Sequence, residues 1–357
     1  MKSFTLTLLL FIFAPGIQAQ SGRIKPSEKP TPTPAQRHGV IYAPTQTQPE
    51  IIKPTTSPTP TPKAQDDDGD VIRIESALVP IPVSVTDASG RAVMNLRLED
   101  FYLEIEGKQV EISEISRSQS PVRLALLFDN SSSVIAAREF EQNAAIRFFR
   151  QVIRPEKDLA ALYSVASASR LEQPLTANVS QLIRAIQLLP PPEGATALLD
   201  SIIKAADYLK EVEGRRVIVI VSDGEDTYSD MDTTLEKTIQ AVQRANCQVY
   251  VVKTTDFENF KKTGSRGGNA NIRSLTAERR MQEIAAQTGG AVYSPIDERE
   301  LDAAFSRISA ELSEQYILSY YPDDDAPSGQ FRSIRLHVKD KNNLTVRTRK
   351  GYYVSRK

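Results

Sequence analysis

The sequence predicts an α/β domain, with a mostly parallel central sheet and helices on both of its faces, inserted into a small split antiparallel β-sandwich. Between residues 122 and 315, apolar runs of strand length alternate with segments of helical periodicity, which is typical of parallel sheets buried on both faces. In residues 71–121, and again in 316–357, apolar and polar residues alternate with a period of two, which predicts antiparallel strands. Because the strands after residue 316 would form a poor core alone, we expect both flanking segments to share one sandwich.

The individual elements follow from these two periodicities. Apolar runs predict strands of the inserted domain at 124–128, 159–166, 216–222, 247–252 and 291–294. Helical spacing predicts helices at 138–153, 180–189, 196–210, 234–245, 277–289 and 300–315. Period two predicts the sandwich strands at 78–87, 101–107, 108–117, 316–322, 331–340 and 344–354. Pro80 and Pro82 cannot donate backbone hydrogen bonds, so the first of these strands is expected at a sheet edge.

Residues 1–70 differ in composition from the rest of the chain. Lys2, the short apolar run 4–14 and the small residue Ala19 predict a signal peptide over 1–19, and hence export to the periplasm, the cell surface or the exterior. The repeated Thr-Pro and Ser-Pro pairs of residues 20–70 predict a disordered, extended spacer. A proline-rich ligand for another module is the alternative. No later run is long enough to predict a membrane span in the mature chain.

Composition excludes several classes of function. A net charge of -1 over 357 residues argues against nucleic acid as a partner. The two histidines, His38 and His337, lie in unrelated segments, which argues against zinc sites and Ser-His-Asp catalysis. Cys247 is the single cysteine, so no intrachain disulfide can form, and its position between a helix and a strand predicts a buried structural thiol.

Three short segments carry the oxygen-bearing side chains that could form a site. The first strand of the inserted domain ends in Asp129, followed by Ser131 and Ser133; Thr196 precedes a helix; and the most apolar strand ends in Asp223. In an open parallel sheet, ligands bind beyond the carboxyl ends of the strands. Two carboxylates and three hydroxyls form a hard oxygen set suited to Mg²⁺, or to Mn²⁺, and none of these groups activates a nucleophile.

Each segment also has a structural interpretation. Ser131 and Ser133 could cap the helix that follows them, and Thr196 could cap the helix predicted at 196–210. Asp223 and Gly224 could serve only to form a turn. Because all three segments occur together in this order, and two of them at strand ends, we favour the metal site.

The DxSxS…T…D pattern resembles the metal-ion-dependent adhesion site of von Willebrand factor type A (VWA) domains, and the resemblance covers residues 122–315. With its flanks, the chain is similar to a secreted bacterial VWFA-related family of acidobacterial type. The resemblance implies a Rossmann-like fold, direct binding of Mg²⁺ by Ser131 and Ser133, binding by Asp129 and Asp223 directly or through water, and a contribution from Thr196 when ligand is engaged. It implies binding of a protein or other ligand that offers a carboxylate to the metal. The sequence departs from the family at the spacer Ser132, where glycine is common.

Two further features lie near the expected site. Asp226 could orient a water or hydroxyl, and we expect it to be a solvated loop acid instead. The segment 254–271 leaves the same sheet edge and carries Lys261, Lys262 and Arg266 among glycines. We interpret it as a loop that either recognises an acidic partner or has no binding role.

The sequence therefore predicts a Mg²⁺-dependent binding or adhesion module that is not an enzyme. One alternative is a Mg²⁺-dependent phosphohydrolase of haloacid-dehalogenase type, but such enzymes need a general acid where this chain has Ser131. The other is a structural VWA scaffold without a working metal site, since a fold alone does not determine a function.

Overall fold

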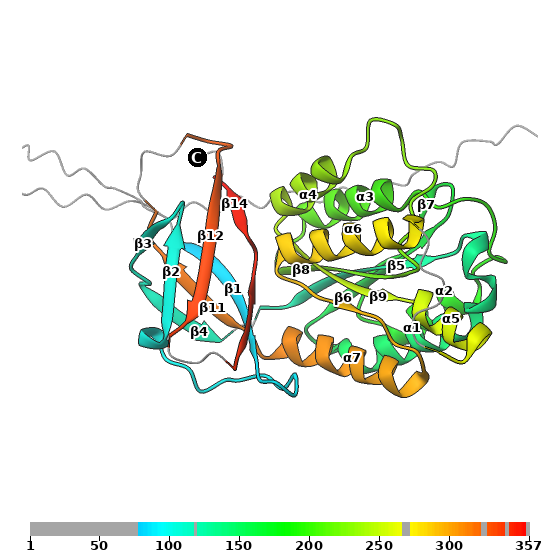
Figure 1. The fold of residues 1–357 in the computed structure, drawn as a ribbon, viewed down its shortest axis with the longest axis horizontal. Helices are drawn as coiled ribbons and strands as arrows, with labels where there is room; N and C mark the ends of the chain where they lie inside the picture. The colour runs from blue at the N-terminus through cyan, green and yellow to red at the C-terminus, as the bar shows by residue number, and fades with distance from the viewer. Residues whose placement is uncertain (1–77, 118–119, 266–271, 323–326, 340–342, 355–357) are drawn as a thin grey trace, which may run out of the picture. The chain divides into compact units, whose positions relative to one another are not determined.

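The computed structural model describes residues 78–117, 120–265, 272–322, 327–339 and 343–354. These residues form an α/β domain flanked by antiparallel sheets, which confirms the predicted fold class (Figure 1). The predicted signal peptide and spacer lie outside the described residues. Among the described helices, none combines the length and the apolar character that a membrane span requires.

The central sheet of the α/β domain is mostly parallel. It contains β5 (Val122–Asp129), β6 (Leu159–Val165), β7 (Ser169–Thr176), β8 (Arg215–Ser222), β9 (Cys247–Lys253) and β10 (Val292–Tyr293). The strand order is β10-β9-β8-β5-β6-β7, and only β7 runs antiparallel to its neighbour. β5 and β8 occupy the middle of the sheet and are buried along nearly their whole length, which explains their uninterrupted apolar sequences.

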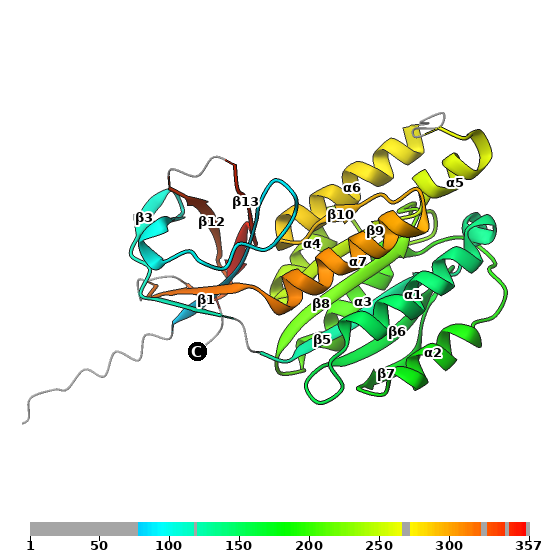
Figure 2. The same cartoon turned by 90° about the horizontal axis from the view of Figure 1, so that it is seen from below.

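Seven helices surround this sheet within the described residues. They are α1 (Arg138–Val152), α2 (Val179–Gln187), α3 (Leu198–Lys210), α4 (Leu235–Arg244), α5 (Thr255–Thr263), α6 (Ile272–Thr288) and α7 (Glu298–Ser313). Helices α1, α2 and α7 cover one face, and α3, α4 and α6 cover the other (Figures 1 and 2). Each face of the sheet has its own hydrophobic core, and successive residues of β5 point into opposite cores. Leu126 packs in the core on the α1 side, and Leu127 packs in the core on the α3 side.

The flanking segments form two four-stranded sheets that share one core. The strands are β1 (Val79–Thr86), β2 (Phe101–Ile105), β3 (Lys108–Val110), β4 (Glu114–Arg117), β11 (Tyr316–Tyr320), β12 (Phe331–Val338), β13 (Thr345–Thr348) and β14 (Gly351–Tyr353). The sheets have the orders β13-β1-β11-β4 and β14-β12-β2-β3, so each combines strands from before and after the α/β domain. Val83, Leu103 and Leu318 are buried together between them. Neither flanking segment could therefore form its core without the other.

Three local expectations differ from the structure. β1 is not an edge strand: β11 pairs with it over Val79–Val83 and β13 over Val83–Thr86. Its prolines are tolerated because that half of the strand has a strand neighbour on one side only. β7 was not predicted, because Pro174 and its half-exposed residues do not give a clear strand pattern. The segment expected as a loop at 254–271 instead begins with helix α5.

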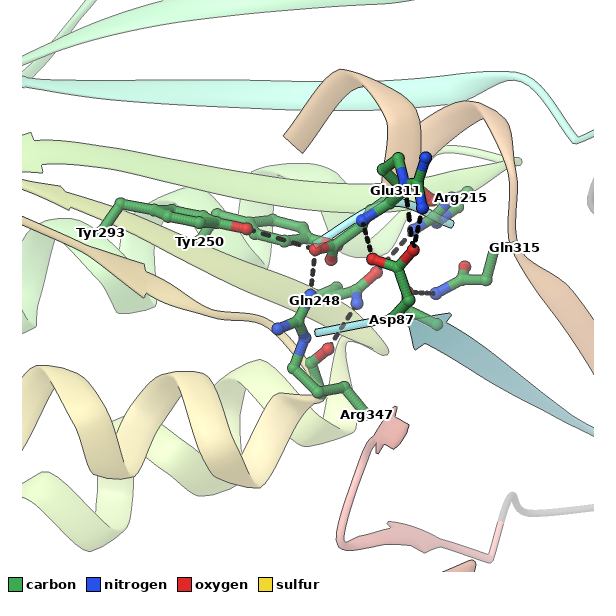
Figure 3. A network of polar contacts seen from close by, with 11 residues as sticks. Asp87, Arg215, Gln248, Tyr250, Tyr293, Glu311, Gln315 and Arg347 are labelled. Atoms are coloured by element: carbon green, nitrogen blue, oxygen red, sulfur yellow. Dashed lines mark hydrogen bonds and ion pairs between the residues drawn. The ribbon is translucent and has the colours of Figure 1, made fainter. Parts of the chain in front are cut away.

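A buried polar network joins the C-terminal end of α7 to the sheet and the sandwich (Figure 3). Both carboxylate oxygens of Glu311 accept hydrogen bonds, one from Tyr250 Oη at 3.0 Å and the other from Tyr293 Oη at 3.2 Å, and Arg347 of β13 pairs with the same carboxylate. Arg215 Nη1 donates to the Leu312 carbonyl at 2.9 Å, and its Nη2 donates to Gln248 Oε1 at 2.7 Å. We call Arg215, Gln248, Tyr250, Tyr293, Glu311 and Arg347 the junction network.

Candidate metal centre

The three predicted segments come together at the carboxyl edge of the central sheet. Ser132 N and Ser132 Oγ both donate to the Gly194 carbonyl, at 3.1 and 2.8 Å, which holds the loop after β5 against the loop before α3. Tyr228 N donates to the Thr196 carbonyl at 2.9 Å, which holds that second loop against the loop after β8. These hydrogen bonds bring all three segments to one place, as strand direction predicts.

Asp129 and the two serines form the centre of this site. Asp129 is fully buried; its Oδ1 accepts from Ser131 N at 2.9 Å and its Oδ2 from Ser222 Oγ at 2.5 Å. The hydroxyl oxygens of Ser131 and Ser133 lie 2.9 Å apart. The carboxylate is therefore fixed in one orientation, and the two hydroxyls are hydrogen-bonded to each other beside it.

Two of the alternative structural roles are not found. Ser131 stands at the N-cap position of the 3₁₀ helix Ser132–Ala136, yet its side chain makes no capping hydrogen bond. Thr196 precedes Ala197, the N-cap residue of α3, and that cap also has no side-chain hydrogen bond. The turn interpretation does apply to Asp223, whose Oδ1 accepts from Glu225 N at 2.9 Å while Gly224 adopts a φ of +83°.

The negative charges of Asp129 and Asp223 act on each other. Burial raises the pKa of Asp129 to about 6, with a further contribution from the negative charge of Asp223. Within the described residues, no group of three or more His, Cys, Asp or Glu side chains is arranged to hold a metal. A cation here would thus depend on hydroxyl oxygens as well as on two acids, and this hard donor set fits Mg²⁺ or Mn²⁺.

Asp226 has a structural role that the sequence did not indicate. It is half-buried, and its Oδ1 accepts from Leu198 N at 2.8 Å and Leu199 N at 3.2 Å, the first residues of α3. Ser229 Oγ donates to the same oxygen at 2.6 Å. Asp226 is thus not the solvated loop acid that we expected. It accepts hydrogen bonds from the free backbone N–H groups at the start of α3, which directly follows the loop that carries Thr196.

Glu141, Thr254 and Ser222 belong to the same region and were not predicted. Glu141, on α1, is fully buried, and neither carboxylate oxygen accepts a hydrogen bond of normal geometry from a described residue. Burial and then the charge of Asp129 raise its pKa well above the usual value, and the adjacent Thr254 hydroxyl opposes this shift. A carboxylate on the apolar stripe of a helix, between Phe140 and Ala144, was the available signal for Glu141.

The basic residues expected to contact a partner are only partly described. Lys261 is exposed on α5, with its Nζ 5.1 Å from the ring centroid of Phe257. Phe257 in turn stacks on Phe140 of α1 at a centroid distance of 3.5 Å. Lys262 lies in the same helix, its side chain outside the described set, and Arg266 lies outside the described residues. Thr255 Oγ1 donates to the Asp223 carbonyl at 3.2 Å, so α5 begins directly beside the site.

Comparison with solved structures finds several bacterial proteins that are similar to part of this chain. The chain is similar to von Willebrand factor type A from Catenulispora acidiphila, with 13% identity over 79% of this chain and 75% of that one, at a TM-score of 0.44. It is similar to BatB from Bacteroides thetaiotaomicron, with 19% identity over 54% of this chain and 98% of that one, at 0.42. The PilB minor pilin from Streptococcus sanguinis shares 13% identity over 55% of this chain, at 0.41, and the match spans only 62% of the pilin.

The family follows from the sequence. No curated protein matches this chain. The family model for the von Willebrand factor type A domain, however, matches residues 124–306, which is more than half of the 357 residues and includes every side chain of the candidate metal centre. The chain therefore belongs to the von Willebrand factor type A domain family.

Proposed function

We propose that this protein is a Mg²⁺-dependent adhesion or protein-interaction module that acts outside the cytoplasm. The observation that carries the proposal is the 2.9 Å separation of the Ser131 and Ser133 hydroxyl oxygens. Two adjacent ligands of an octahedral Mg²⁺ ion, each bonded at 2.0–2.1 Å, lie about 2.9 Å apart. The serine hydroxyls are hydrogen-bonded to each other at this distance, and their spacing matches one edge of such an octahedron; a bound cation would replace that hydrogen bond.

The roles of the five ligands follow from their charges and positions. Ser131 and Ser133 would bind the cation directly, Asp129 and Asp223 directly or through water, and Thr196 when a ligand is engaged. When bound, the cation supplies a positive charge that can accept a carboxylate from a partner. Because three of the five protein ligands are neutral hydroxyls, the protein's negative charge at the cation comes from Asp129 and Asp223 alone, and an acid that acts through water leaves a coordination position open to exchange. The partner's acid would complete the coordination.

Exposed apolar side chains near the site favour a protein as the partner. Ile135 follows Ser133 by two residues and is 62% exposed, and Tyr228, whose N–H contacts Thr196, is 63% exposed. Met231 in the same loop is fully exposed. Exposed apolar groups around a polar centre are typical of protein interaction surfaces. A partner would thus combine an acidic side chain with apolar neighbours.

Calorimetric titration with Mg²⁺ tests the metal site. The wild-type chain is expected to bind one Mg²⁺, and Ser131→Ala is expected to lose the binding heat while keeping the fold, because the hydroxyl caps no helix. Ser132→Ala is the matched control: its hydroxyl bonds Gly194, and the adjacent backbone bond remains. Equal heats for the wild type and Ser131→Ala would refute the role of the serine pair.

A peptide-display selection tests the binding function. Random peptides are captured on the wild-type protein in Mg²⁺ and eluted with a chelator. The proposal expects enriched peptides to contain Asp or Glu, and to lose binding when this residue is changed to Asn or Gln. Capture that is indifferent to Mg²⁺ or to the acid would contradict it. Magnesium-dependent turnover of phosphate esters by the same preparation would instead favour the phosphohydrolase alternative.

A further inference from the structure

The hydroxyl group of Ser222 links the two acidic segments of the candidate metal centre. Ser222 is the last residue of β8, and it is 1% exposed. Its Oγ donates to Asp129 Oδ2 at 2.5 Å and accepts from Gly224 N at 3.0 Å. Gly224 directly follows Asp223 in the chain. One buried hydroxyl therefore contacts both the carboxylate of Asp129 and the backbone of the turn after Asp223.

The orientation of this hydroxyl is fixed by its neighbours. Because the Gly224 N–H donates to Ser222 Oγ, the hydroxyl hydrogen has to point elsewhere, and Asp129 accepts it. The backbone of Ser222 is fixed too, since it pairs with β9 and its carbonyl accepts from Thr254 N at 3.1 Å. The O···O separation of 2.5 Å is in the range of hydroxyl bonds to an ionised carboxylate, which are roughly twice as strong as neutral ones. Asp129 therefore has a strong and well-oriented donor on Oδ2.

Ser222 and Ser131 hold the Asp129 carboxylate from different segments of the chain. Ser131 N, in the loop after β5, donates to Oδ1 at 2.9 Å, whereas the Ser222 hydroxyl reaches Oδ2 from β8. Rotation of the carboxylate would move both oxygens and lengthen at least one of these bonds. The carboxylate therefore presents its remaining lone pairs in a fixed direction. Substitution of Ser222 removes one of the two bonds without changing a candidate metal ligand.

A carboxylate that cannot rotate favours a small cation over a large one. Mg²⁺ requires nearly ideal octahedral geometry with bonds of about 2.0–2.1 Å. Ca²⁺ accepts about six to eight oxygens at about 2.3–2.6 Å in a flexible geometry, and carboxylates often bind it through both oxygens. A set of ligands adapts to Ca²⁺ when its carboxylates can turn and move outward. The two hydrogen bonds of Asp129 oppose this adjustment.

We propose that Ser222 is a positioning residue that selects the cation: its hydrogen bond to Asp129 keeps the site suited to Mg²⁺ and disfavours Ca²⁺. This inference rests on the proposed function. It adds a specificity that the five candidate ligands do not explain by themselves, since carboxylate and hydroxyl oxygens also bind Ca²⁺. If the hydroxyl served only to satisfy a buried carboxylate, its removal would lower stability without changing the preference between the two cations.

The test measures the Mg²⁺ and Ca²⁺ affinities of the wild-type chain and of Ser222→Ala by calorimetry. The wild type should bind Mg²⁺ more tightly than Ca²⁺. In Ser222→Ala the Mg²⁺ affinity should fall about 10-fold, the lower end of the usual effect of removing a group that supports a metal ligand. The Ca²⁺ affinity should fall less, because a carboxylate that can turn adjusts to the larger ion. The preference for Mg²⁺ should therefore narrow.

Two further substitutions of Ser222 separate the hydrogen bond from the shape of the side chain. Ser222→Thr keeps the hydroxyl and should keep the wild-type preference for Mg²⁺. Ser222→Cys replaces the hydroxyl by a thiol, which is a weak donor, and should narrow the preference as Ser222→Ala does. Thermal unfolding in chelator checks that each variant is folded before its cation affinities are compared.

Ser164→Ala is the matched control. Ser164 lies near the end of β6, which pairs with β5, and it is 5% exposed. Its Oγ donates to Glu172 Oε1 at 2.6 Å, so it is also a buried serine that holds a carboxylate. Glu172 is not a candidate ligand. Ser164→Ala should therefore unfold at a lower temperature than the wild type and keep the wild-type preference between Mg²⁺ and Ca²⁺.

The outcomes separate the inference from the function on which it rests. A preference in Ser222→Ala that stays within about twofold of the wild type, the usual scatter between independent sites, would overturn the role of Ser222 while leaving the metal site in place. Equal affinities of the wild type for Mg²⁺ and Ca²⁺, or the same narrowing in Ser222→Thr or Ser164→Ala, would overturn it too. A wild-type chain that binds neither cation would overturn the proposed function, and this inference with it.

Discussion

Two buried glutamates on the same face of the central sheet have opposite environments. Glu311, on α7, is surrounded by donors: both of its oxygens accept hydrogen bonds from tyrosines, and Arg347 pairs with it. Glu141, on the adjacent helix α1, has no such partner and lies among other acids. Burial alone therefore does not indicate the role of a charged residue. The partners of Glu311 indicate a structural role, whereas burial raises the pKa of Glu141 well above its usual value.

The largest effect that we expect is on stability, at the junction network. Glu311→Ala leaves Arg347 and two tyrosine hydroxyls without their acceptor. Removing one partner of a buried ion pair typically costs about 3–5 kcal/mol of unfolding free energy. Urea denaturation with a two-state fit measures this loss, and the Mg²⁺ affinity should not change. A loss below about 1 kcal/mol would mean that the network is not the structural element described here.

The second-largest effect that we expect comes from Asp226, whose replacement should lower both the free energy of unfolding and the binding at the candidate metal centre. Asp226→Ala removes the acceptor for two backbone N–H groups of α3. We expect a loss of about 1–2 kcal/mol, the usual range for a helix-terminal acceptor. Because the neighbouring loop carries Thr196, this variant should also bind Mg²⁺-dependent peptides more weakly.

Asp297→Ala is the matched control for this prediction. Asp297 caps α7 by accepting from Glu300 N at 2.8 Å, away from the three loops of the site. It should lose a similar amount of stability and keep wild-type peptide binding. Equal peptide binding by both variants would contradict the link between Asp226 and Thr196.

The smallest effect concerns Cys247, which begins β9 and reports on the junction end of the sheet. Burial raises the pKa of this thiol to about 12, so little of the reactive thiolate is present near neutral pH. We expect a thiol reagent to label the native protein very slowly, and the unfolded protein rapidly. Glu311→Ala should be labelled faster than the wild type, whereas Ser131→Ala should not. Rapid labelling of the native wild-type protein would contradict the burial of Cys247.

Much of the fold could be predicted because its strands are buried on both faces. The sequence of β8 is apolar almost without interruption. Val217 to Val221 are all buried, so both faces of the strand carry apolar side chains instead of alternating with polar ones. β7 escaped prediction because it is a half-exposed edge strand whose pairing with β6 is irregular. Pro80 and Pro82 led to the wrong prediction that β1 is an edge strand. The half of β1 that contains them pairs with β11 only, but the other half pairs with β13, so the strand as a whole has a neighbour on each side.

The sequence predicted the five candidate ligands of the metal centre. Asp129, Ser131, Ser133, Thr196 and Asp223 were chosen because strand ends of a parallel sheet share one edge, and the structure places their segments together. Their assignment as metal ligands stays a prediction. Glu141 and Ser222 could not be assigned to the site, because their relation to Asp129 arises from tertiary packing.

One measurement tests the central claim most directly: the anomalous scattering of crystals grown with Mn²⁺ in place of Mg²⁺. The account predicts a single strong peak that bonds the hydroxyl oxygens of both Ser131 and Ser133, with Asp129 and Asp223 bonded directly or through water. Soaking with excess Mg²⁺ should remove the peak. A map without a peak between the two serines, or with the strongest peak elsewhere on the protein, would contradict it.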